Sequence, residues 1–156
     1  MTFSFSALYE LCCDFCGELE TAKQESDRFL EQFHTEDRVR FSDFEQIKKQ
    51  YLPPYTTLVS ALLSSLERTD RLGLRLAELL ESTDTPDSFE HSPRIIRLWD
   101  AYDQYRADLD AFLVESKRYF SNEEAVRQKG TAPLVLSTRT LIASLLRTQA
   151  CFASNQ

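Results

Sequence analysis

Apolar side chains recur in alternating steps of four and three residues over most of this 156-residue chain, and this spacing constrains the fold more than any other feature. Residues at this spacing lie on one face of an α-helix, and the helix can bury that face only by packing against other elements. The chain has only three glycines, and leucine outnumbers valine and isoleucine together, which favours helix over strand. We therefore expect an all-α protein.

Helix-breaking and capping residues divide the apolar pattern into segments. These segments predict four long helices and one or two short ones, at about residues 4–33, 43–51, 54–82, 93–120, 121–129 and 133–152. Pro53 and Pro54 are expected to end the short helix at 43–51, with Pro54 in the first turn of the next helix. Because short connections make successive helices neighbours, we predict a single antiparallel helical bundle over residues 1–156.

Two short motifs refine these boundaries. Ser42 with Glu45, and Ser121 with Glu124, have the Ser-x-x-Glu spacing of a capping box, in which both side chains accept hydrogen bonds from backbone N–H groups at a helix start. Ser42 and Ser121 are therefore the predicted N-caps of the two short helices. Gly130 is expected to end the second short helix, since glycine readily adopts the backbone conformation that closes a helix.

The helix at 54–82 has the broadest predicted apolar face. Its stripe repeats in steps of four and three through Tyr55, Val59, Leu62, Leu66, Thr69, Gly73, Leu76 and Leu80. The face is widened by Leu58, Leu63, Leu72 and Leu79. A wide apolar face is buried by more than one neighbour, so this helix is expected to be central and to contact two others.

The charge and the beginning of the chain exclude several classes of function. The net charge is −7, whereas a protein that binds nucleic acid needs lysine and arginine to meet the phosphates, so no nucleic-acid partner is expected. There is no run of about 18 apolar residues, so no membrane-spanning helix is predicted. The apolar residues 1–11 lack the basic region of a signal peptide. Since the four cysteines suit a reducing compartment, we predict a cytoplasmic protein.

Charge is distributed unevenly along the chain. The first 45 residues carry a net charge equal to that of the whole chain, whereas no acidic residue follows Glu124. The acidic first helix, with Glu18 and Glu25, is a candidate surface for a basic protein, because complementary charge steers association. Packing of the first helix against the last would match part of this charge within the chain, and the sequence leaves that packing open.

Three of the four cysteines lie close together near the N-terminus. Cys13 and Cys16 form a Cys-x-x-Cys pair, a spacing found in zinc and redox sites. A structural zinc site needs four ligands, and the two histidines, His34 and His91, are distant from the cysteines in sequence. We therefore expect the cysteines to act as small apolar side chains on a helix, and we predict no metal site and no cofactor.

Four carboxylates form the pattern Glu-x-x-Glu followed by Asp-x-x-Asp, at Glu78, Glu81, Asp100 and Asp103. The pattern resembles the E-x-x-E and E-x-x-D motifs of all-α nucleoside triphosphate pyrophosphatases of the MazG type, although Asp100 stands where that family has glutamate. The resemblance implies a magnesium-dependent nucleotide pyrophosphatase in which these carboxylates hold the metal against a triphosphate. Helical spacing instead places all four on the solvent side of their helices, so this enzyme is the alternative function.

Arginines at steps of three and four form a basic stripe on the helix at 54–82. Arg68, Arg71 and Arg75 lie on one face of that helix, where they are candidates for binding an acidic partner or a phosphate. Glu67 and Asp70 stand among them, which favours a solvated and ion-paired face over a binding site. We include the three arginines among the candidate partner-binding residues.

Trp99, Tyr102 and Arg106 are a second set of candidates, because tryptophan, tyrosine and arginine are the residues that most often anchor protein interfaces. With these surfaces, the predicted function is a non-catalytic protein-binding module, such as a secretion or export chaperone, an immunity protein or an adaptor. The expected partner is another protein, a basic one if the acidic first helix makes the contact. A homodimer is a further alternative, since four–three stripes also pair helices of two chains.

Overall fold

The computed structural model describes residues 4–33, 44–81 and 93–153, which form five α-helices and no strand. The long helices are α1 (Phe5–Glu31), α2 (Phe44–Leu80), α3 (Pro93–Ser121) and α5 (Ala132–Ala153), and the short helix α4 spans Glu123–Lys129. This architecture confirms the predicted all-α bundle of four long helices with a short one. None of these helices is both long and apolar enough to cross a membrane.

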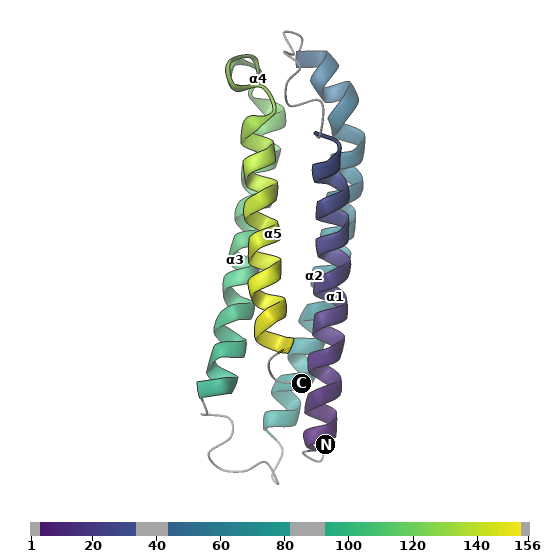
Figure 1. The fold of residues 1–156 in the computed structure, drawn as a ribbon, viewed down its shortest axis with the longest axis vertical. Helices are drawn as coiled ribbons and strands as arrows, with labels where there is room; N and C mark the ends of the chain where they lie inside the picture. Colours follow the sequence, from purple (N-terminus) through teal and green to yellow (C-terminus); the bar gives the residue numbers. More distant parts are fainter. Residues whose placement is uncertain (1–3, 34–43, 82–92, 154–156) are drawn as a thin grey trace.

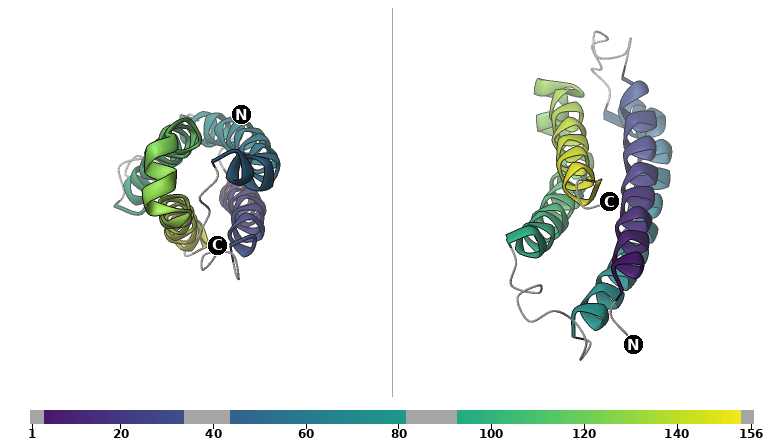
Figure 2. Two further views of the ribbon diagram at one scale, coloured as in Figure 1. Left: turned by 90° about the horizontal axis from the view of Figure 1, so that it is seen from above. Right: turned by 60° about the horizontal axis from the view of Figure 1, so that its bottom comes forward.

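The four long helices lie side by side and alternate in direction (Figure 1). α1 packs against both α2 and α5, and α3 packs mainly against α5. The backbones of α2 and α3 approach each other at few points, so side chains close that side of the bundle. Figure 2 shows the helices surrounding a common axis when the molecule is seen from above. The first and last helices thus pack together, which the sequence left open.

The predicted apolar stripes of α1, α3 and α5 are buried along their whole length. They meet in one core, in which the Phe15 ring of α1 stacks on the Phe152 ring of α5 with ring centroids 4.3 Å apart. The same Phe15 ring meets Tyr102 of α3 edge-on at 5.6 Å. Burying one such aromatic side chain stabilises the fold by about 1.5–3 kcal/mol, so these rings anchor three helices to one another.

The buried face of α2 is rotated from the predicted one. Ser65 is fully buried, whereas Val59 and Leu66 are only half-buried and Leu63 is 49% exposed. The Ser65 hydroxyl donates a hydrogen bond to the backbone oxygen of Glu18 at 3.2 Å, which satisfies this polar group at the contact with α1. A small hydrogen-bonded serine therefore faces α1 where the apolar pattern predicted a leucine, and the core placement of Leu63 was wrong.

α2 also continues through Pro53 and Pro54, where the sequence predicted a break. Two prolines remove two backbone N–H donors from the helix, a change that usually interrupts it. Here, however, the residues on both sides bury the same face: Ile47 and Tyr51 before the prolines, and Tyr55 after them. Burial of these large side chains outweighs the local cost, and Pro53 itself lies on the exposed side of the helix.

The caps of α4 differ in part from the prediction. Ser121 is the last residue of α3, and the N-cap of α4 is Asn122, whose side chain accepts a hydrogen bond from the backbone N–H of Ala125 at 3.0 Å. Asparagine caps helices as well as serine does, so the boundary moves by one residue. Gly130 ends α4 as predicted, with φ at +59°. The capping motif predicted at Ser42 lies outside the described residues.

We expect Pro53→Ala to increase the free energy of unfolding by about 1–3 kcal/mol, because alanine restores an N–H donor inside a continuous helix. Urea denaturation followed by circular dichroism measures the change. Pro133→Ala is the control, since Pro133 lies in the first turn of α5, where no donor is lost. A decrease in stability for Pro53→Ala would contradict a continuous α2.

Candidate functional site

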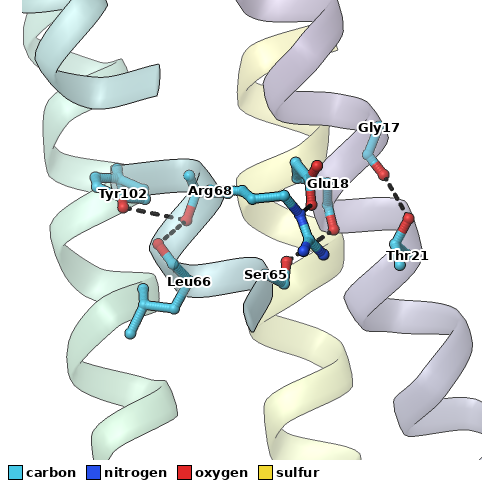
Figure 3. Close-up of polar contacts among 8 residues, drawn as sticks. Gly17, Glu18, Thr21, Ser65, Leu66, Arg68 and Tyr102 are labelled. Carbon is cyan, nitrogen blue, oxygen red and sulfur yellow. Dashed lines mark hydrogen bonds and ion pairs between the residues drawn. The ribbon is translucent and has the colours of Figure 1, made fainter. Parts of the chain in front are cut away.

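A cleft of about 500 Å³ lies between α1 and α2. One wall comes from α1 and the other from α2, and the lining residues are Cys13, Asp14, Gly17, Glu18, Arg68, Arg71, Leu72 and Arg75. We call this region the arginine cleft. Figure 3 shows part of it, with Arg68 reaching from α2 toward Glu18 on α1. The structure thus brings the whole predicted basic stripe to one site, opposite one of the acids predicted on the first helix.

Helical spacing explains why these residues share the cleft. Arg68, Arg71 and Arg75 follow one another at steps of three and four, so all three project from the same face of α2. Leu72, which neighbours Arg71 along the chain, is only 8% exposed and belongs to the core. Its burial fixes the rotation of α2 about its axis, and that rotation holds the arginines at the edge of the α1–α2 contact.

Two of the three arginines form ion pairs within the chain. The Nε atom of Arg68 lies 2.8 Å from Oε2 of Glu18, and this pair bridges α2 and α1. Arg71 pairs with Glu67 one turn earlier on α2, at 2.6 Å. Arg75 is exposed and forms no ion pair within the described part of the chain. Exposed pairs of this kind contribute only about 0–1 kcal/mol, so they can exchange partners.

The acids predicted to meet a basic partner are already paired. Besides Glu18 with Arg68, Glu25 forms an ion pair with Arg28 on α1 at 2.7 Å. A third α1 carboxylate, that of Glu20, accepts a hydrogen bond from the Gln149 side chain of α5 at 2.9 Å. Part of the negative charge of the first helix is therefore matched inside the molecule.

Gly17 stands in the middle of α1 and lines the cleft, although sequence reasoning did not select it. A Cβ atom built on Gly17 would have no heavy atom within 4 Å, so packing inside the chain does not require glycine here. The backbone oxygen of Gly17 accepts a hydrogen bond from the Thr21 hydroxyl at 3.1 Å (Figure 3). A glycine midway along a helix, on its solvent-facing side, was the signal in the sequence that could have marked this position.

The second set of candidates lies at the contact between α2 and α3, outside the cleft. The Tyr102 hydroxyl shares its one proton between the Asp70 carboxylate and the Thr69 hydroxyl oxygen, and Nε of Arg106 lies 3.2 Å from Oδ1 of Asp70. Burial, reinforced by the hydrogen bond to Asp70, raises the pKa of Tyr102. Tyr102 is only 5% exposed and Trp99 is partly buried against the core, so these side chains hold α3 against α2.

The four carboxylates of the pyrophosphatase pattern do not form a metal site. Glu78, Glu81, Asp100 and Asp103 are all exposed. Within the described ranges, no group of three or more His, Cys, Asp or Glu side chains is placed to hold a metal ion. Since no three of these exposed carboxylates come together, they do not form the magnesium centre that the resemblance implies.

The cysteines contribute to packing between helices. None of the four forms a disulfide, and Cys12 is buried in the core. The thiol of Cys16 donates to the backbone oxygen of Gln149 on α5 at 3.7 Å, and burial raises the pKa of this thiol. Cys151 makes the corresponding contact with the backbone oxygen of Arg97 on α3, at 3.6 Å.

A scan against protein-family models, a search of curated proteins and a search of solved structures each returned no match. A functional proposal must therefore come from the side chains of this chain. The arginine cleft brings several charged groups of two helices to an open surface.

The fully buried hydroxyl of Tyr105 has no hydrogen-bond partner among the described residues, and burial raises its pKa. We expect Tyr105→Phe to increase the free energy of unfolding by about 1 kcal/mol, since it removes an unsatisfied polar group. Tyr102→Phe, which deletes hydrogen bonds to Thr69 and Asp70, should lower it. Thermal and urea unfolding measure both changes. A loss of stability for Tyr105→Phe would instead indicate a buried water bound to the hydroxyl.

We expect Gly17→Ala to increase the free energy of unfolding by about 0.5–1 kcal/mol, because alanine is the better helix former and its methyl group enters open space. Urea denaturation measures the gain. Ala143→Gly on the exposed face of α5 is the reverse control and should lose a similar amount. A loss of stability in the Gly17→Ala variant would show that the added methyl group meets other side chains, and so that no open space lies over Gly17.

Proposed function

We propose that this protein is a non-catalytic protein-binding module of the chaperone, immunity-protein or adaptor type, and that it binds its partner at the arginine cleft. The observation that carries the proposal is the cleft itself, with charged walls from two helices and a leucine at its base. Arginine is among the residues that dominate binding energy at interfaces, because its planar group forms several directed hydrogen bonds and also stacks on apolar surfaces.

Apolar surface beside the cleft supports the proposal. Leu74 is 67% exposed and lies one turn of α2 from Arg71, next to Arg75 in the chain. An exposed leucine flanked by arginines gives a partner both apolar area to bury and charge to pair. The open space over Gly17 on the opposite wall leaves room for a partner side chain.

The rigidity of the cleft walls also favours binding. Both walls are faces of long helices whose other sides are buried in the core, at Phe15 and Leu19 of α1 and at Leu76 and Leu79 of α2. The backbone positions that carry the arginines are therefore fixed before the partner arrives, so little backbone conformational entropy is lost on binding. We place the module in the cytoplasm, a compartment that suits four cysteines present as thiols.

A photo-crosslinking residue at position 17 tests the surface, with one at position 143 on the exposed face of α5 as the matched control. The full chain carrying either residue is illuminated in an extract of its native cells. We expect a discrete crosslinked protein at position 17 alone, identified by mass spectrometry. Equal crosslinking at both positions, or none, would contradict the proposal.

The identified partner then allows a quantitative test. We expect Gly17→Phe to weaken binding of the purified partner by at least about tenfold, equivalent to about 1.4 kcal/mol, because the ring fills the cleft. Ala143→Phe should change the affinity by less than about twofold, a difference within the usual effect of a surface substitution. Circular dichroism confirms that both variants fold. Equal losses for the two variants would place the contact elsewhere.

A further inference from the structure

We infer that the arginine cleft binds an acidic polypeptide segment of the partner, one that presents carboxylates to Arg68, Arg71 and Arg75. This inference rests on the proposed function and names the chemistry of the partner. It reverses the expectation drawn from the acidic first helix, because the two α1 acids selected there, Glu18 and Glu25, already pair with arginines of the chain.

Arg75 provides the first contact. Its guanidinium is exposed at the cleft and has no ion-pair partner in the part of the chain that the structure describes. A carboxylate that reaches Arg75 therefore forms a new pair without breaking an existing one. Arginine can bind a carboxylate through two parallel hydrogen bonds, and this geometry makes it selective for acidic side chains.

Arg68 and Arg71 extend this contact along α2. Both lie in solvent-exposed ion pairs, with 46% of the Arg68 side chain and 69% of the Arg71 side chain accessible. Such pairs are weak in water, so an incoming carboxylate can share either arginine with Glu18 or Glu67 or replace the internal partner. Together the three arginines span roughly 10 Å along the helix axis at 1.5 Å per residue.

The local charge at the cleft is balanced, in contrast to that of the whole protein. Three arginines and the carboxylates of Asp14 and Glu18 line the cleft, and a third carboxylate, that of Glu67, pairs with Arg71, whereas the chain carries a net charge of −7. At physiological salt, charges beyond about 8 Å are largely screened, so the more distant acidic residues repel a bound segment only weakly and exposed Arg75 attracts it. An acidic segment is thus attracted at contact even though the molecule as a whole is negative.

The test uses a labelled, capped helical peptide of about 15 residues, long enough to be helical, with three glutamates at steps of four and three and leucines beside them. A second peptide has glutamine in place of each glutamate. Fluorescence anisotropy with the full chain measures both affinities at low and physiological salt. We expect the glutamate peptide to bind at least about tenfold more tightly, with the difference shrinking as salt increases.

Charge reversal in the protein supplies the matched control. Arg75→Glu and Arg139→Glu change the net charge equally, but Arg139 is an exposed residue of α5, away from the cleft lining. Arg75→Glu should weaken binding of the glutamate peptide by at least about tenfold, and Arg139→Glu by less than about twofold. Equal effects of the two substitutions, equal affinities of the two peptides, or no binding of either would overturn the inference.

The natural partner separates this inference from the proposed function. If Gly17→Phe abolishes partner binding while Arg75→Glu leaves it unchanged, the cleft is the binding surface but the segment is not acidic. If neither substitution affects the partner, the proposed function at the cleft fails as well. Loss of binding in both variants, but not in Arg139→Glu, supports the two together.

Discussion

The packing of α1 against two helices at once is the constraint on which the rest of the structure depends. Within two turns, Glu18 pairs with Arg68 of α2, while Cys16 and Glu20 contact Gln149 of α5. Because α2 and α3 approach each other at few points, α1 is the element that holds the two halves of the bundle together. The arginine cleft follows from the same arrangement, since it lies at the edge of the α1–α2 contact.

Much of the fold was predictable because periodicity reports directly on burial. Where the prediction failed, tertiary contacts overrode a local rule. Pro53 and Pro54 break helices in general, but here the residues on either side bury one continuous face against the core. The four–three spacing predicted Leu66 on the buried face, yet Ser65 is the buried residue, because a hydrogen bond to the α1 backbone satisfies its hydroxyl. Neither outcome is visible until the neighbouring helix is placed.

Of the two walls of the candidate site, only the α2 wall could be predicted as a group of residues from the sequence. Spacing alone placed Arg68, Arg71 and Arg75 on one face, but the opposite wall comes from residues about 50 positions earlier, and only the packed bundle brings the two together. Residue type was a poorer guide. Tyr102 and Arg106 have the chemistry of interface anchors, but both bind Asp70 and join α3 to α2. Residue types show which side chains could bind a partner. They do not show whether other residues of the same chain already bind those side chains.

The sparse contact between α2 and α3 makes the cohesion of the bundle uneven. The α1–α5 contact joins two helical hairpins, α1 with α2 and α3 with α5, and on the other side polar bridges such as Tyr55 to Ser116 and Tyr102 to Asp70 link them. Because segments joined by few contacts open at the lowest free energy, we expect local opening of this molecule to begin as a separation of its two hairpins along the α2–α3 side.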